Sequence, residues 1–394
     1  MHNIFPILVL HEGGDDSRGN KMRNRRRIVA MAMSILLVTL LATYLLLCFL
    51  PVSSHEKSDL SAAYKIVYSD MFSSNKGGIL TIDEQGSIIH DEPLGDLQNA
   101  AEYSYKDGIF IAGGRRHNTH LIIGKNSKSK LIHLLSDPNY SGVMSIEPHN
   151  GGVSAVMNGN DSPEDDSYLN LLVIEDSNGK VLEKRILKIY TEDQVSTDEN
   201  MFIVGHELTL SSNRYQGKII RYDFSTGGIT EKVTDDNLLY DQLVLWNKQL
   251  LVVGTDLNGL PEQIDMFDAS TLERVASIRL ESDFHSLISV KGWPWIIGST
   301  QACPISDNSY DIDRAKCLDI PTIKDTQDVT QAISSQNKAF ILIRDKTISE
   351  ENGIKAIGNI LAIDTKTGDT VLAPVHIPSN RSTDSILFLP YPLR

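Results

Sequence analysis

A short motif repeats along this chain at a regular interval. Each copy has an apolar strand, an aspartate, a turn that holds glycine in four of five copies, and a second strand. The aspartates are Asp83, Asp176, Asp223, Asp268 and Asp364. Their spacings of 93, 47, 45 and 96 residues are one or two multiples of a period of about 47. Short strands joined by Asp and Gly turns are hairpin signals, so each copy predicts a hairpin.

A second pattern repeats with the same period. Apolar runs that end in glycine recur at intervals of 44 to 49 residues. They close at Gly113, Gly159, Gly205, Gly254 and Gly298. The series extends forward to Arg344 and back to Val67, which makes seven positions. Two patterns that share one period indicate seven copies of one structural unit.

Repeats of 40 to 50 residues built from several short strands are typical of β-propeller blades. The sequence therefore predicts an all-β fold, a single seven-bladed β-propeller over residues 63–394. The Asp motif is expected to be the outer hairpin of each blade, and a blade buries its faces only between two neighbours. The apolar C-terminal segment 385–394, "SILFLPYPLR", is expected to supply the innermost strand of the first blade and so close the ring.

The runs that end in glycine are interpreted as the innermost strands, because a strand that is buried on both faces is continuously apolar. Segments such as "KVLEKRILK" at 180–188 mix apolar with charged residues, which favours outer strands with one face in water. On this assignment, the acidic run at 158–167 lies between the innermost and the next strand of the third blade.

An uncharged segment precedes the repeats. Residues 28–50 contain no charged side chain, and a helix of this length, at about 1.5 Å per residue, spans roughly 35 Å, enough to cross a bilayer. The preceding segment 21–27, "KMRNRRR", carries five positive charges, which favours the cytoplasmic side. We expect a cytoplasmic basic tail at 1–27, a transmembrane helix or signal anchor at 28–50, a linker at 51–62 and an extracytoplasmic domain, held at the cell membrane by a single pass.

Other interpretations of this region stay open. Val52 and Ser54 would make a tolerable signal-peptide cleavage site, in which case the segment would be removed. Met22 opens directly onto the basic run and could be the true start. Cys48 lies inside the apolar run and follows three leucines, which favours a thiol that faces lipid over a lipoprotein cysteine.

The sixth repeat departs from the pattern, because its outer hairpin is replaced by "CPISDNSYDIDRAKCLDIP" at 303–321. Cys303 and Cys317 are the only cysteines outside the apolar segment. On the oxidising side of a membrane they are expected to form a disulfide that closes a 15-residue loop, worth roughly 3 kcal/mol in the chain-entropy model. Two unpaired thiols are the alternative.

The acidic run "NGNDSPEDDS" at 158–167 is a candidate calcium site. Its Asp161, Asp165 and Asp166 could act together, because hard cations take several carboxylate ligands. The spacing fits no known calcium loop, and acidic loops are commonly just solvated.

A second candidate site is basic. Arg115, Arg116 and His117 form the only compact basic cluster of the predicted domain and could bind an anionic group. The chain as a whole has 37 basic and 51 acidic residues, a net charge of -14. This charge repels phosphate backbones, so we expect no nucleic acid partner.

The repeated hairpins resemble those of the YVTN and quinoprotein-like families of seven- or eight-bladed propellers, over residues 60–394. The resemblance implies the propeller fold and no particular activity. The tryptophan-docking signature of the quinone-binding members is missing, because the chain has only Trp246, Trp293 and Trp295.

No motif identifies an enzyme: the sequence has no G-x-S-x-G, H-E-x-x-H, C-x-x-C or glycine-rich phosphate loop. No cofactor is predicted. We favour a membrane-anchored binding or scaffold module with a protein or other cell-envelope partner, because loops on a rigid ring make a wide docking surface. The alternative is a lactonase-like hydrolase or a quinone-dependent oxidoreductase. An enzyme would need three or more ionisable side chains to converge on one end of the central channel.

Overall fold

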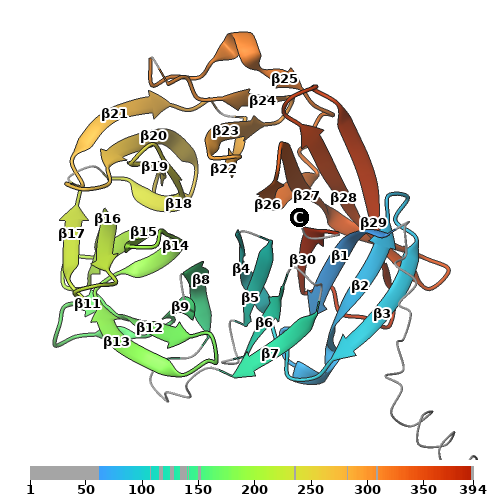
Figure 1. The fold of residues 1–394 in the computed structure, drawn as a ribbon, viewed down its shortest axis with the longest axis horizontal. Helices are drawn as coiled ribbons and strands as arrows, with labels where there is room; N and C mark the ends of the chain where they lie inside the picture. Colours follow the sequence, from blue (N-terminus) through green and yellow to red (C-terminus); the bar gives the residue numbers. More distant parts are fainter. Residues whose placement is uncertain are drawn as a thin grey trace, which may run out of the picture. The chain divides into compact units, whose positions relative to one another are not determined.

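The computed structural model describes residues 62–106, 108–114, 119–124, 128–133, 140, 142–149, 152–234, 237–281, 283–307 and 309–391. Seven antiparallel sheets stand around a common centre (Figure 1), so the predicted all-β, seven-bladed propeller is confirmed. The basic tail, the apolar segment 28–50 and the linker up to residue 61 lie outside the described residues. Among the described residues, no helix is long and apolar enough to span a bilayer.

Each blade runs from an innermost strand at the channel to an outermost strand at the rim. In this order, blade 1 has β30 (Ser385–Pro390), β1 (Ala62–Ser69), β2 (Gly77–Asp83) and β3 (Ile88–Leu94), with the 3-10 turn η1 (Ser74–Lys76). Blade 2 has β4 (Ala100–Lys106), β5 (Ile109–Gly114), β6 (Thr119–Ile123) and β7 (Ser129–His133). Blade 3 has β8 (Val143–His149), β9 (Gly152–Met157), β12 (Asn170–Asp176) and β13 (Val181–Leu187). Blade 4 has β14 (Tyr190–Ser196), β15 (Asn200–Thr209), β16 (Arg214–Asp223) and β17 (Ile229–Val233).

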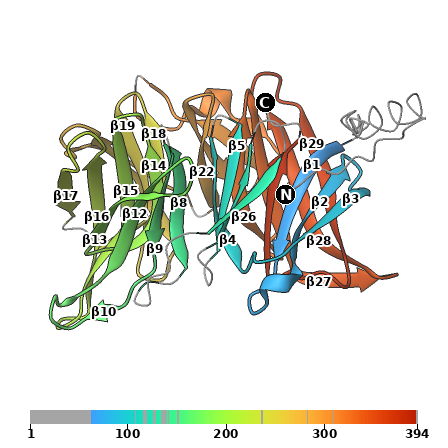
Figure 2. The ribbon, with the colours of Figure 1, turned by 60° about the horizontal axis from the view of Figure 1, so that its bottom comes forward.

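The other three blades have the same strand order. Blade 5 has β18 (Leu239–Trp246), β19 (Gln249–Thr255), β20 (Pro261–Asp268) and β21 (Arg274–Arg279). Blade 6 has β22 (Phe284–Val290), β23 (Trp293–Gly298), β24 (Gln301–Pro304) and β25 (Leu318–Asp319), with η2 (Arg314–Lys316). Blade 7 has β26 (Gln327–Ser335), β27 (Lys338–Glu351), β28 (Ile354–Asp364) and β29 (Thr370–Pro378). In the turned view of Figure 2, the long β27 projects beyond its neighbours.

Each repeated aspartate ends the third strand of its blade and organises the turn into the outermost strand. The Asp223 carboxylate accepts hydrogen bonds from the backbone N–H groups of Ser225 at 2.8 Å and Thr226 at 2.9 Å. Hydrogen bonds from the Ser225 hydroxyl and from these N–H groups lower the pKa of Asp223 to about 2. The repeated Asp motif is therefore the outer hairpin, as the sequence predicts.

The assignment of the apolar runs that end in glycine was wrong by one strand. These runs are the second strands of their blades, such as β19, and not the innermost ones. A second strand has a sheet neighbour on each edge and a blade on each face, whereas the innermost strand borders the central channel and carries polar residues. The acidic run at 158–167 consequently lies between the second and third strands of blade 3.

In blade 4 the repeated glycine is required by a close approach of the innermost strand. A Cβ atom on Gly205 would lie 2.0 Å from the carbonyl oxygen of Tyr190, at the start of β14. This distance is far too short for two non-bonded atoms, so a side chain here would push β14 away from β15. The neighbour differs between blades, because a Cβ atom on Gly159 would instead lie 1.9 Å from the carbonyl oxygen of Leu169, beside the third strand of blade 3.

The C-terminal strand β30 closes the ring. It pairs with β1, with Phe388 opposite Ile66 and Leu387 opposite Val67. Gln331 of blade 7 holds it from the other side: the Phe388 N–H donates to the Gln331 Oε1 at 2.6 Å, and the Gln331 Nε2 donates to the Phe388 carbonyl at 2.9 Å. Blade 1 is therefore built from both ends of the propeller.

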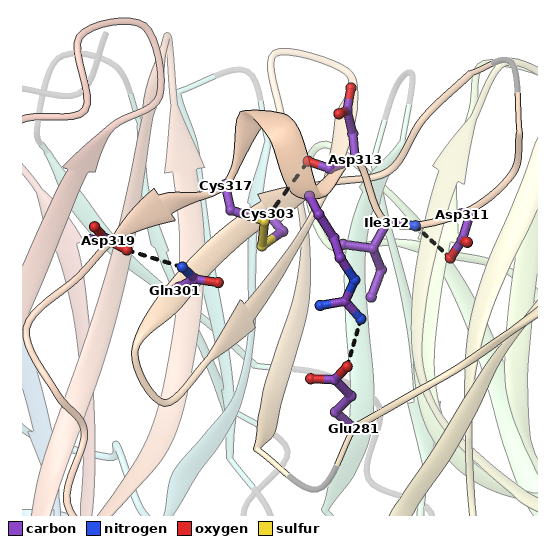
Figure 3. The surroundings of a disulfide bond; sticks show 9 residues. Glu281, Gln301, Cys303, Asp311, Ile312, Asp313, Cys317 and Asp319 are labelled. Carbon is purple, nitrogen blue, oxygen red and sulfur yellow. Dashed lines mark hydrogen bonds and ion pairs between the residues drawn. A yellow bond between two sulfur atoms is a disulfide. The ribbon is translucent and has the colours of Figure 1, made fainter.

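The irregular hairpin of blade 6 is fastened by a disulfide between Cys303 and Cys317 (Figure 3). Two polar contacts flank it: the Gln301 side chain donates to Asp319 at 3.0 Å, and Arg314 pairs with Glu281 at 2.6 Å. The bridge joins β24 to Cys317, the residue before β25. Because β25 has only two residues, the ladder between β24 and β25 is short, and the disulfide holds the two strands together.

Candidate functional site

The innermost strands of blades 2 to 7 line a cavity of about 800 Å³ in the central channel. This volume lies in the range of small-molecule sites in proteins. The site is built on strands of six blades, so its side chains are held by the whole ring rather than by one mobile loop.

All six of these strands carry a β-bulge near their first residues. A bulge leaves one residue without a ladder partner and re-aims side chains. In blades 4 and 6 the extra residues are Glu192 and His285, and in blade 5 the bulge falls at Asp241 and Gln242. Blades 2 and 3 have Ala101 and Met144 there, so the ionisable bulge residues gather on one side of the ring.

One end of the cavity is acidic. Its described lining there includes Glu102, Glu192, Asp193, Asp241 and His285, all near the start of the innermost strands. We call these five residues the acidic end. Burial raises the pKa of Asp241 and raises that of Asp193 well above its usual range, where the charges of Glu147 and Asp241 add to the effect. Desolvated, mutually repelling carboxylates of this kind favour the binding of a positive charge.

In blades 4, 5 and 7 a side chain at or directly after the bulge ties its blade to the next one. The Asp193 carboxylate accepts from the Leu243 N–H at 2.8 Å, and the Gln242 side chain accepts from the Leu287 N–H at 2.8 Å. Gln331 holds Phe388 in the same way. These contacts fix the bulges in place, so the acidic end is organised without a ligand.

The opposite end of the cavity contains Lys106 and Lys291. Lys106 lies 3.7 Å from the Glu147 carboxylate and donates to the Ser196 carbonyl at 2.6 Å. Glu147 is buried, and although Lys106 favours its charged form, burial dominates and raises the pKa of Glu147 to about 6. Acidic side chains therefore line one end of the channel, and lysines line the other.

Comparisons with known proteins place the chain by fold only. No family model matches the chain, and no curated protein matches it. A functionally unknown protein from Desulfotomaculum acetoxidans superposes with a TM-score of 0.50 at 10% identity, over 82% of this chain and 98% of that one. The chain shares the propeller fold.

Two further solved structures are similar at lower TM-scores. AztD from Citrobacter koseri gives 0.46 at 9% identity, over 84% of this chain and 98% of AztD. BamB from Moraxella catarrhalis gives 0.42 at 10% identity, over 81% of this chain and 91% of BamB. Identities this low say nothing about activity.

Two of the three aspartates of the predicted calcium site, Asp165 and Asp166, have protein partners. Asp165 pairs with Lys188 at 3.0 Å, and Asp166 accepts from the backbone and side chain of Ser211, both at 2.6 Å. Through Asp166 and the short strands β10 (Asp161–Ser162) and β11 (Ser167–Tyr168), the acidic loop of blade 3 is attached to blade 4. Within the described ranges, no group of three His, Cys, Asp or Glu side chains could hold a metal ion. The calcium site stays a prediction.

The predicted basic cluster of Arg115, Arg116 and His117 lies outside the described residues, so the anion site also stays a prediction. The acidic end was not predicted at all. A weak signal existed, because Glu192, Asp241 and His285 each stand 13 residues before a glycine of the second pattern.

Proposed function

We propose that this protein is a binding propeller that holds a cationic ligand at the acidic end of its central channel. The observation that supports this most directly is the convergence of Glu102, Glu192, Asp193 and Asp241 from three blades on one end of an 800 Å³ cavity. No lysine or arginine of the described chain lines that end of the cavity, since Lys106 and Lys291 line the other.

Desolvation makes Asp193 and Asp241 better cation receptors than exposed carboxylates. A bound cation favours their ionised form and returns part of the free energy that burial cost, because opposite charges interact more strongly at low dielectric than in water. Binding should therefore release protons from Asp193 and Asp241, whose pKa values burial has raised.

Titration calorimetry with spermidine, a trivalent organic cation, tests the proposal. We expect binding with proton release, and at least a tenfold loss of affinity in Asp241→Asn and in Glu192→Gln. Glu350→Gln, an exposed carboxylate of β27, is the matched control and should bind normally. The proposal fails if spermidine does not bind, or if the control and channel variants lose affinity equally.

We propose in addition that the propeller is tethered outside a membrane, on the strength of the uncharged segment 28–50 and its basic flank. A protein or other cell-envelope component with a basic group would then be the natural ligand. An enzymatic role is the second candidate, and the presence of more than three ionisable side chains at one end of the channel favours it.

A further inference from the structure

A serine and a histidine are hydrogen-bonded at the edge of the acidic end. The His285 Nε2 lies 3.0 Å from the Ser299 Oγ. His285 is the bulge residue of β22, and Ser299 follows Gly298 at the end of β23, so the crowding of the two strands brings the side chains together. Both residues are half-buried, and His285 lines the cavity.

The same two positions form a polar pair in another blade. In blade 4 the bulge residue Glu192 lies 3.9 Å from His206, which follows Gly205. In blade 6 the pair combines a base with a hydroxyl group. Of these two pairs, only Ser299 with His285 combines a nucleophile with a general base.

The surroundings of this pair suit acyl transfer. Asp283 and Asp328 lie close enough to His285 to favour its protonated form, while burial has the larger, opposite effect on its pKa. His285 is therefore neutral at pH 7 and can accept a proton. The carboxylates of Asp283 and Asp328 then stabilise the imidazolium that results. Ser299 and Thr300 form the short connection between β23 and β24, so the backbone N–H of Thr300 directly follows the serine in the chain.

We propose that Ser299 is a nucleophile activated by His285 and that the pair hydrolyses small carboxylic esters. The Ser299 Oγ bonds to the ester carbonyl carbon as its proton passes to the His285 Nε2, and the backbone N–H of Thr300, the residue after the nucleophile, donates to the carbonyl oxygen as it becomes negative. The C–O bond to the alcohol then breaks, and the alcohol leaves with the proton from His285. Water attacks the acyl-serine, gives a proton to His285, and releases the carboxylic acid as Ser299 is reprotonated.

The cavity beside the pair indicates the class of ester. Asp241 and Glu192 line the same end, so an ester that carries a positive charge is favoured over a neutral one. This preference rests on the proposed function, whereas the nucleophilic character of Ser299 does not.

Labelling of the full-length protein with a fluorophosphonate, followed by peptide mass spectrometry, tests the nucleophile without a known substrate. We expect an adduct on Ser299, none in Ser299→Ala, and a labelling rate at least about 100-fold lower in His285→Gln, the size typical of losing a general base. Ser177→Ala, which removes an exposed serine of a turn in blade 3, is the control and should label normally.

Hydrolysis of acetylcholine and of its uncharged isostere 3,3-dimethylbutyl acetate separates the two proposals. A preference for the cationic ester that disappears in Asp241→Asn supports both. Hydrolysis of both esters without such a preference supports the dyad and contradicts the cationic ligand. If no adduct forms on Ser299 while the thermal midpoints of the variants match that of the wild type, the dyad is wrong, whatever spermidine binding shows.

Discussion

Closure of the ring by the C-terminal strand can be tested with one side chain. Phe388 lies in the middle of β30, is fully buried, and packs in the cluster that contains β1 and the strands of blade 7. Phe388→Ala removes the aromatic ring but keeps the backbone hydrogen bonds to Gln331. A buried Phe→Ala change costs about 3 to 5 kcal/mol.

The size of the thermal shift follows from the length of the unit. A propeller of residues 61–394 has an unfolding entropy of roughly 0.7 kcal/mol/K if each residue contributes about 2.1 cal/mol/K. Each kcal/mol then lowers the midpoint by about 1.4 °C, so Phe388→Ala should melt about 4 to 7 °C below the wild type. Near-ultraviolet circular dichroism of the purified protein measures this midpoint.

Leu372→Ala is the matched control, because Leu372 lies on the outermost strand β29 and is 46% exposed. Its loss should cost about 0.5 kcal/mol or less, a shift below about 1 °C. Equal midpoints for Phe388→Ala and Leu372→Ala would contradict the closure, because a strand that does not seal blade 1 would tolerate the cavity.

Three further predictions concern the pH response, the disulfide and the topology. Burial raises the pKa of Glu147 from 4.5 to about 6, so the folded state holds this proton more tightly than the unfolded chain does. The stability present below pH 4.5 is therefore lost, by about 2 kcal/mol, as pH rises through 6. Glu147→Gln should remove this loss, which urea titrations at about pH 4.5 and 7 measure. Mapping under non-reducing conditions should find the peptides of Cys303 and Cys317 linked, and alkylation of both thiols in freshly isolated protein would contradict the bridge. Protease added to intact cells should digest the propeller, and full protection would refute the proposed extracytoplasmic position.

The sequence revealed the blade count because the repeated residues answer local needs. Asp223 is repeated in other blades since one carboxylate satisfies the N–H groups of a tight turn, and Gly205 lies where its strand β15 is crowded by the preceding strand β14. Blades that share the same turn and the same kind of crowding need the same residue types. These residues can therefore be recognised from a single sequence.

The innermost strands were misplaced because their pattern is not strongly apolar. β14 alternates buried and half-buried residues, and its bulge shifts that alternation by one residue. A period-2 pattern that slips in the middle looks irregular, while β15, which is buried without a break from Met201 to His206, looks like the clearest strand of the blade. The channel and its acidic end were hidden for the same reason.

The position of the bulge predicts a separation between stability and function at Asp241. Blade 2 has alanine at the equivalent position and the same bulge, so the fold does not require a charged side chain there. Burial raises the pKa of Asp241, which means that its ionised form is less stable in the folded protein than in the unfolded chain. Asp241→Asn should therefore lower the affinity for the cation at least tenfold while the thermal midpoint at pH 7 stays the same or rises.

The same argument sets the sign of the pH dependence. A raised pKa contributes stability at low pH that is lost as pH rises, so the midpoint difference between Asp241→Asn and the wild type should be smallest in acid and grow toward neutral pH. A midpoint of Asp241→Asn that falls below the wild type at pH 7 would show that the carboxylate stabilises the ring. The acidic end would then be a structural feature of blade 5, and the cationic ligand would lose its main support.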